Sequence, residues 1–210
     1  MLNTTAMQES AAKRRGLVAR YPKEHKDVTR RRILDTAGRR FKRDGLDGSG
    51  IATLMSDAGL TNGAFYAHFS SKDDLVAAVV RDQLSTQARA IHELRPGRAG
   101  LEDFVRQYLS AEHRDEVAAG CPSAALLDEI GRGGHPVKVA YTAGAARILD
   151  EVTTRLALSD PNAARRIAQS LFTLLVGTMQ LARALADREA SDTVLEQGIA
   201  AALDLLALVD

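Results

Sequence analysis

Two features in the first third of the chain have side chains suited to binding a polyanion. Residues 1–45 contain thirteen lysines and arginines against five acidic residues, a net charge of +8, whereas the rest of the chain carries a net charge of −7. Beyond this basic segment, Asn62 carries an amide that can form two hydrogen bonds with one base edge, and the hydroxyl of Thr61 can bind a phosphate. A basic segment joined to a mildly acidic remainder indicates a polyanion-binding end on a larger body.

The spacing around these residues predicts two short helices joined by a tight turn. Ser49 is placed to cap the first helix, and Gly59 follows its last apolar residue, where a left-handed turn favours glycine. Thr61 begins a second helix that runs to about Phe69. Ser71 then begins a third and longer helix, with an acidic residue three positions later that completes a capping box.

A helix over residues 27–44 completes the predicted N-terminal domain. Its apolar residues recur at helical spacing and are surrounded by arginines and lysines. Helix, glycine-containing turn and helix is the plan of the helix-turn-helix, whose second helix lies in the major groove of DNA. Packing the three helices together predicts a core of Phe41, Leu46, Leu54, Phe65 and Phe69.

The run AGLTNGAFYAHFSSKDDL resembles the DNA-binding signature of the tetracycline-repressor (TetR/AcrR) family of bacterial transcription regulators. The agreement includes the glycine-containing turn, Gly63, Tyr66 and Phe69, and the Ser-Lys-acid-acid-Leu sequence of residues 71–75, at fixed spacing and without a gap. The resemblance covers about the first third of the chain. It implies an all-α fold, with an N-terminal three-helix helix-turn-helix domain and a C-terminal helical domain for ligand binding and dimerisation.

The resemblance also implies which residues contact DNA. The small residues beside Asn62 would face the groove and offer shape and methyl contacts, so the set of base-reading side chains is sparse. Tyr66 and His68 correspond to positions that touch the DNA backbone or neighbouring bases, and Lys72 corresponds to a lysine that binds phosphate at a helix start. The predicted DNA-binding set is Ser49, Thr61, Asn62, Gly63, Ala64, Tyr66, Ala67, His68 and Lys72.

The sequence on either side of this domain predicts a basic arm and a larger second domain. Residues 1–26 are rich in small and basic residues, and Tyr21-Pro22 predicts an interruption of any helix there. The arm would be flexible or loosely helical; it would either contact phosphates or serve as an unstructured leader, and both interpretations stay open. The predicted domains are the arm at residues 1–26, the helix-turn-helix domain at residues 27–71 and the ligand-binding and dimerisation domain at residues 72–210.

The last two predicted helices carry apolar residues beyond a single stripe. One starts at Asp160-Pro161, a capping aspartate followed by proline, and the other is predicted to start at Ser191. Such wide apolar faces indicate deep burial or a partner. In the family that the chain resembles, these helices form a four-helix interface between two subunits, and a two-fold dimer matches a palindromic DNA site. The predicted interface residues are Leu171, Leu174, Leu175, Met179, Leu195, Ile199 and Leu203.

The resemblance further implies a small-molecule pocket among the middle helices. The candidate residues are Phe104, Tyr108, Cys121, His135, Tyr141, Phe172 and Met179. Core packing is the competing interpretation, because buried aromatic residues normally fill space. Cys121 is the single cysteine and would permit a sensor of oxidants or electrophiles, although lone cysteines more often act as small apolar residues.

Other functional classes have little support in the sequence. No apolar run approaches the ~20 residues of a membrane span, and no secretory signal is evident, so we expect a soluble cytoplasmic protein. The chain lacks a glycine-rich phosphate loop, a zinc pattern and a nucleophile elbow, so we expect no enzyme activity, metal or cofactor. We predict a ligand-responsive repressor that binds a palindromic operator as a homodimer; a non-specific DNA-binding protein is an alternative.

Overall fold

The computed structural model describes residues 4–207, with side chains from residue 24 onwards, and all the regular secondary structure in this part of the chain is helical. The predicted all-α fold is therefore confirmed. The helices are α1 (Thr4–Asp44), α2 (Ile51–Asp57), α3 (Asn62–Phe65), α4 (Lys72–His92), α5 (Arg98–Tyr108), α6 (Ala111–Asp115), α7 (Pro122–Arg132), α8 (His135–Leu156), α9 (Pro161–Ala184) and α10 (Arg188–Ala207).

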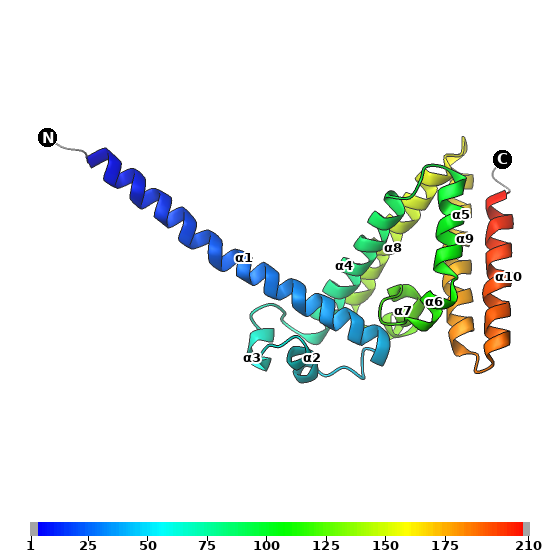
Figure 1. The fold of residues 1–210 in the computed structure, drawn as a ribbon, viewed down its shortest axis with the longest axis horizontal. Helices are drawn as coiled ribbons and strands as arrows, with labels where there is room; N and C mark the ends of the chain where they lie inside the picture. Colours follow the sequence, from blue (N-terminus) through cyan, green and yellow to red (C-terminus); the bar gives the residue numbers. More distant parts are fainter. Residues whose placement is uncertain (1–3, 208–210) are drawn as a thin grey trace.

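A small N-terminal domain is formed by α1, α2 and α3 together with the start of α4 (Figure 1). The apolar side of α1 meets the two short helices, and Phe41, Phe65 and Phe69 are at most 2% exposed. Leu46 and Leu54 are also buried, so the predicted core of this domain is confirmed. Burying these side chains fixes the angle at which the two short helices leave α1.

α1 extends much further towards the N-terminus than the sequence pattern predicted. It begins at Thr4, and its first half projects away from the rest of the protein (Figure 1). The interruption predicted at Tyr21-Pro22 is wrong, because the helix continues through the proline with the loss of one backbone hydrogen bond. The alanines, lysines and arginines around it favour helix, which offsets that loss. The contacts predicted for the arm before residue 24 lie outside the described side chains.

α4 connects the N-terminal domain to the second domain. Its first turns lie beside α1, and most of its length packs along α8 (Figure 1). The two helices approach most closely at Gly144, where an added Cβ would lie 2.5 Å from Leu84 Cδ1. The absence of a side chain at Gly144 therefore lets Leu84 of α4 pack directly on the backbone of α8.

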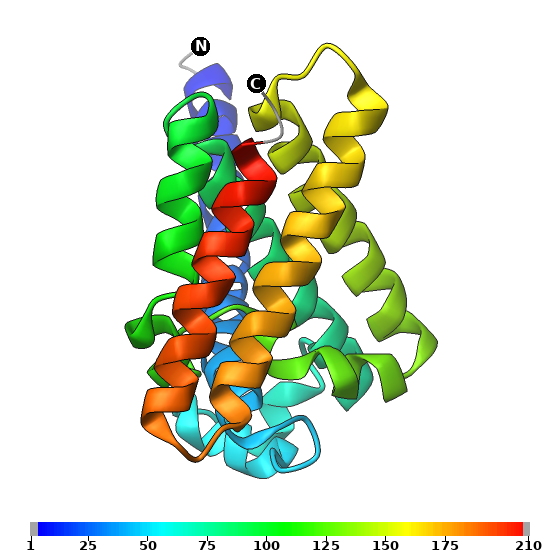
Figure 2. The same ribbon diagram turned by 90° about the vertical axis from the view of Figure 1, so that its right-hand side faces the viewer.

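α9 and α10 lie side by side and cover one face of the second domain (Figure 2). They pack closely at Gly198, where an added Cβ would lie 2.4 Å from Thr178 Cγ2. α9 also packs against α7 and α8. The two helices close the core with one side and present the other side outwards.

Two predicted helix starts are wrong, and in both cases the serine is buried. The Ser49 hydroxyl donates to the Gly45 carbonyl at 3.1 Å, and α2 has no side-chain cap. The Ser191 hydroxyl donates to the Ala182 carbonyl at 2.7 Å, and the Asp187 carboxylate accepts from the first amides of α10 instead. A serine hydroxyl donates to carbonyls as well as accepting from amides, so its presence does not by itself locate a helix start.

α5 and α6 are separated by a two-residue break. Ser110 lies between them and accepts a hydrogen bond from the His113 amide at 3.1 Å, which caps α6. The chain turns sharply at this point. The turn brings the His113 ring back against Tyr108, with ring centroids 4.7 Å apart.

Candidate nucleic-acid interface

The turn between α2 and α3 has the conformation that the sequence predicted. Gly59 has a φ of +64°, in the left-handed region that favours glycine. The Leu60 amide donates to the Met55 carbonyl at 2.8 Å and closes the end of α2. Thr61 then lies in extended backbone immediately before α3, and its exposed hydroxyl does not cap the helix.

α3 and the turn after it have one side buried against the domain core and the other side exposed to solvent. Phe65 is fully buried, whereas the next residue, Tyr66, is 67% exposed. α3 ends at Phe65 and continues as turns instead of reaching Phe69 as a helix. Ser49 is fully buried, so its place in the predicted DNA-binding set is wrong. Of the other members, Thr61, Asn62, Gly63, Tyr66 and Ala67 are exposed, and Ala64, His68 and Lys72 are half-buried.

Arg30 of α1 holds the end of this turn in place. Its guanidinium donates to the His68 carbonyl at 2.8 Å and lies 4.3 Å from the centre of the Phe69 ring. Burial lowers the pKa of His68, and the positive charges of Lys26 and Arg30 lower it further. Arg30 cannot be distinguished in the sequence from the run of basic residues around it, because only the folded chain defines their partners.

Lys72 is the first residue of α4, beside the end of the turn. Ser71 caps this helix by accepting from the Asp74 amide at 3.1 Å, as predicted. The Asp74 carboxylate accepts from the Ser70 amide at 2.9 Å, one residue earlier than in a standard capping box. Lys72 therefore lies half-exposed at a rigid helix start that also carries unpaired backbone amides.

Several cations of α1 are held by carboxylates of the protein itself. Arg31 forms ion pairs with Asp35 and Asp82, and Arg40 forms one with Asp57. These pairs fasten α1 to α2 and α4 across the surface. The count of basic residues in the sequence thus overstates the charge that this domain offers to a polyanion.

A cavity of about 910 Å³ lies where the N-terminal domain meets the second domain. It is lined by α1, α4, α5, α6 and the segment that leads to α7. Of the predicted pocket residues, Phe104, Tyr108 and Cys121 line it, and Cys121 is a buried free thiol. His135 is exposed at the start of α8, and Tyr141 donates to the Ser123 hydroxyl. The remaining four predicted pocket residues do not line this cavity; they are His135, Tyr141, Phe172 and Met179.

The residues predicted for a dimer interface divide into two groups. Leu171, Leu175, Met179 and Leu195 are buried within the single chain, where they belong to its core. Leu174, Ile199 and Leu203 are half-buried. The outward apolar residues at the end of α9 are instead Leu181 and Leu185, which are 52% and 37% exposed.

Residues 33–79 match the profile of the bacterial regulatory proteins of the tetR family. This segment runs from the middle of α1 through α2 and α3 to the first turns of α4.

The N-terminal domain is a TetR-type DNA-binding domain.

Relatives of known class share this N-terminal domain. The HTH-type transcriptional regulator AcrR of Shigella flexneri is 37% identical over 62 residues, which are 30% of this chain and 29% of AcrR. The HTH-type transcriptional repressor AcnR of Corynebacterium diphtheriae is 30% identical over 92 residues, which are 44% of this chain and 46% of AcnR. The chain thus matches less than half the length of these curated relatives.

Solved TetR-family structures share the fold over most of the chain. The regulator SCO4454 of Streptomyces coelicolor is 27% identical with a TM-score of 0.63, covering 84% of this chain and 94% of that one. The reduced form of E. coli NemR is 21% identical with a TM-score of 0.72, covering 83% of this chain and 95% of that one. The second domain therefore follows the fold of the family, although the sequence match is concentrated in the first domain.

Two structural features are absent from residues 4–207. No helix in this part of the chain has the length and apolar character needed to cross a membrane. Among the same residues, no group of three or more histidine, cysteine, aspartate or glutamate side chains is arranged to hold a metal ion.

Proposed function

We propose that this protein is a cytoplasmic transcription regulator of the TetR family, a repressor that binds a palindromic operator as a homodimer and is released by a small-molecule effector. The observation that carries the DNA-binding part is the outward row of Thr61, Asn62 and Tyr66 beside Lys72, on a helix-turn-helix whose inner side is fully packed. Backbone and side-chain donors gathered on a rigid edge are the requirement for docking on phosphates.

The proposed contacts divide into positioning and reading. Thr61, Tyr66 and Lys72 would bind phosphates and fix the orientation of α3 in the major groove. Asn62 is the residue with an amide able to pair with an adenine edge, and Gly63 would let the backbone approach closely, since nothing lies within 4 Å of an added Cβ there. Phosphate contacts would supply most of the affinity, so binding should weaken steeply with salt.

The outward faces of α9 and α10 are the surface that we propose for dimerisation. Leu181 and Leu185 are exposed there, and Gly177 is exposed with open space around it. A two-fold pair of chains would bury these apolar residues and allow backbones to approach at the glycine. The core residues Leu171 and Leu175 would support this face from inside rather than contact the second copy.

The effector would bind in the cavity between the two domains. Because α1 and α4 both line it, a ligand there contacts helices that belong to the DNA-binding domain. A ligand shifts the protein away from the DNA-binding state only if it binds that state less well than another. A cavity at the junction meets this condition, since its shape depends on how the domains are placed.

The DNA-binding part is tested by fluorescence anisotropy on an operator selected from random DNA and on a scrambled copy. We expect Lys72→Ala to weaken binding to both DNAs by a similar factor, because a phosphate contact carries no sequence information. Asn62→Ala should reduce the preference for the operator, by about tenfold for a lost bidentate contact. Equal binding of the wild-type protein to both DNAs would instead favour the non-specific alternative.

A further inference from the structure

The inner end of the cavity contains a buried lysine that has no carboxylate partner in the described part of the chain. Lys42 of α1 is 7% exposed, and its Nζ donates to the Gly120 carbonyl at 2.7 Å. Burial lowers the pKa of Lys42 from 10.5 to about 8. Buried lysines are normally paired, because an ammonium in a low-dielectric site is costly without a counter-charge. Because Lys42 also lines the cavity, an anion bound there could supply the missing counter-charge.

A second cation lies directly behind Gly120. Arg183 of α9 donates to the carbonyls of Arg114 and His113, at 3.1 and 2.6 Å, and its Nη1 is buried without a partner among the described residues. Burial lowers the pKa of Arg183. A Cβ added to Gly120 would lie 3.0 Å from the Arg183 guanidinium, so the glycine allows both cations to approach the same peptide. Lys42 and Arg183 are therefore both bonded to backbone carbonyls here, and the carboxylate that acts on Arg183 is that of the exposed Asp115, which is already paired with Arg114 and Arg188.

The neighbouring histidine does not change this balance. The Cys121 amide donates to His113 Nε2 at 3.0 Å, so the proton of the ring is on Nδ1, which donates to the Tyr108 carbonyl at 2.6 Å. Burial lowers the pKa of His113, which agrees with this neutral form. Both ring nitrogens are thus occupied, and His113 supports the cavity wall.

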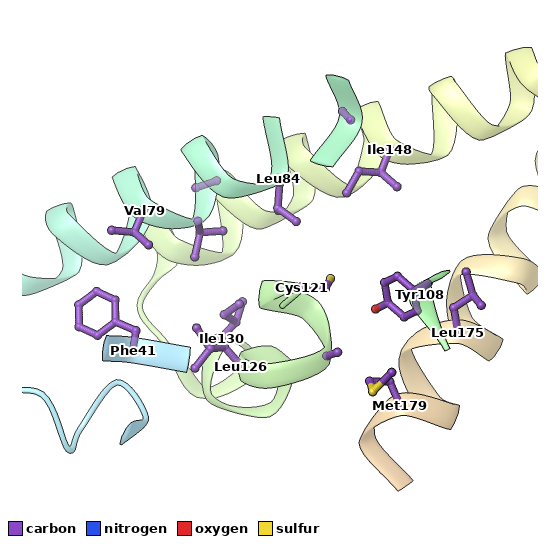
Figure 3. Close-up of a cluster of buried hydrophobic side chains, with 14 of the residues drawn as sticks. Phe41, Val79, Leu84, Tyr108, Cys121, Leu126, Ile130, Ile148, Leu175 and Met179 are labelled. Carbon is purple, nitrogen blue, oxygen red and sulfur yellow. The ribbon is translucent and has the colours of Figure 1, made fainter. Parts of the chain in front are cut away.

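Tyr108 supplies an unused donor at the same place. It is 6% exposed, and within the part of the chain that the structure describes its hydroxyl has no oxygen or nitrogen partner, only the weakly accepting thiol of Cys121 beside it. The hydroxyl points towards Cys121 at the start of α7 (Figure 3). Burial raises the pKa of Tyr108 well above its usual value, so the group keeps its proton. A buried hydroxyl without a partner loses free energy that a bound ligand would restore.

None of the carboxylates that line the cavity forms an ion pair with Lys42 or Arg183 among the described residues. Asp35 and Asp82 are both paired with Arg31, and Glu112 and Glu116 are exposed to solvent, where water screens them. The apolar part of the lining includes Leu94, Phe104 and Pro122. The cavity therefore combines an apolar wall with a buried cationic end.

We propose that this cavity binds a small organic anion, a carboxylate on an apolar or aromatic body, with its charged group on Lys42 Nζ and the Tyr108 hydroxyl. The apolar body would lie along Phe104 and the residues near it. A carboxylate accepts from both donors and balances the two buried charges, which a neutral ligand of the same shape does not.

The proposed anion would also act on the joint between the two domains, a step that rests on the proposed function. The Lys42–Gly120 bond ties α1 to the segment before α7, and the Glu129 carboxylate of α7 accepts from the Leu46 amide at 3.0 Å. A carboxylate competes with the Gly120 carbonyl for the ammonium, because a charged acceptor is the stronger one. Breaking this bond would loosen the N-terminal domain on one side and change the spacing of two such domains in a dimer.

The test uses 2-naphthoate and its neutral isostere 2-naphthamide, with binding to the full chain measured by calorimetry in the absence of DNA. We expect naphthoate to bind about tenfold to a hundredfold more tightly than the amide, the ratio for a charge-assisted bond to a buried group. Lys42→Met should reduce this ratio to about threefold or less with little change for the amide. Lys42→Arg keeps the charge and should retain the preference.

The outcomes separate the anion site from the proposed function. Equal affinity of the wild-type protein for the two probes, or a preference that persists in Lys42→Met, would overturn the anion site. Circular dichroism and a melting curve identify a variant that has not folded. If Lys42→Met does not fold, Tyr108→Phe replaces it in the comparison of naphthoate with naphthamide. Because Tyr108→Phe removes only one donor, we expect a smaller reduction in the affinity ratio. If naphthoate binds selectively but leaves operator affinity unchanged, the coupling to DNA is wrong; if the protein binds no DNA at all, the proposed function fails while the anion site stands.

Discussion

The outer face of the N-terminal domain and the junction beneath it use the same residue types in opposite environments. On the outer face, Arg31 and Arg40 are paired with carboxylates at the surface, and Lys72 is half-exposed to solvent. At the junction, Lys42 and Arg183 are bonded to carbonyls. The first arrangement leaves stability insensitive to single charges and suits reversible docking on DNA. The second concentrates uncompensated charge where a ligand can reach it.

The sharpest test of the outer face compares two neighbouring residues. Phe65→Ala should destabilise the protein by about 3–5 kcal/mol, because it removes a fully buried ring from the core of a small domain. Tyr66→Ala should change stability by less than about 0.5 kcal/mol and weaken DNA binding. Chemical denaturation and anisotropy measure the two effects. Similar losses of stability in both variants would contradict the division into an inward and an outward side.

At the junction, close packing of α4 on α8 makes a second prediction. Gly144→Ala should destabilise the protein by about 1–3 kcal/mol, since the new methyl group would overlap Leu84. Gly131→Ala in α7 is the matched control, with nothing within 4 Å of its added Cβ, and should be stabilising by about 0.5–1 kcal/mol. Urea denaturation of both variants tests the pair. A neutral Gly144→Ala would show that α4 can move against α8 without cost.

The sequence predicted the outer face better than the junction, for a physical reason. Phe41, Phe65 and Phe69 belong to local helical patterns, and local periodicity identifies their buried sides. Lys42 follows Phe41 and looks like one more surface cation, because the side of α1 that it occupies is buried only by segments about eighty residues away. Long-range packing of this kind leaves no mark on the pattern of a single helix.

The same limit applies to the pocket and to the caps. The family resemblance predicts Tyr108 and Cys121 as pocket residues, but it does not predict Lys42 of α1, which lines the same cavity and donates to the Gly120 carbonyl. Ser49 and Ser191 were taken as helix caps because their residue type permits it, whereas tertiary burial gave both hydroxyls carbonyl partners. Residue type and spacing define what a side chain can do, and tertiary contacts decide which option is used.

The pH dependence of naphthoate binding tests whether the buried Lys42 behaves differently from a surface lysine such as Lys72. The pKa of Lys42 is about 8, lowered first by burial and then by Arg39 and Arg183, with Cys121 acting in the opposite direction. Its ammonium is present below this value, so naphthoate affinity should be constant near pH 7 and fall by up to about tenfold per unit above pH 8. Binding should raise the pKa of Lys42 in turn.

Matched variants show whether this pH dependence belongs to Lys42. Lys42→Arg should give a nearly flat profile between pH 7 and 9, because arginine keeps its charge. Cys121→Ser should leave the profile of the wild-type protein unchanged. A profile that disappears in Cys121→Ser would assign the titration to the thiol and contradict the role of the ammonium.

The smallest expected effect concerns the ion pairs on the protein surface. Arg132→Met removes a pair with Asp128 on the exposed surface of α7, and Arg31→Met removes the pairs with Asp35 and Asp82. Each should change the free energy of unfolding by about 1 kcal/mol or less, and the effect should shrink further in high salt. A loss of several kcal/mol for either would mean that the surface charges are structural after all.

The most direct test of the account is a hydroxyl-radical footprint of the protein on an operator selected from random DNA. A two-fold dimer that reads DNA through α3 predicts two protected half-sites of matching sequence, related by a dyad and separated by about one helical turn or a multiple of it. Lys72→Ala should weaken both half-sites together. Protection that spreads along the DNA without regard to sequence, or a single protected site without a dyad, would contradict the central claim.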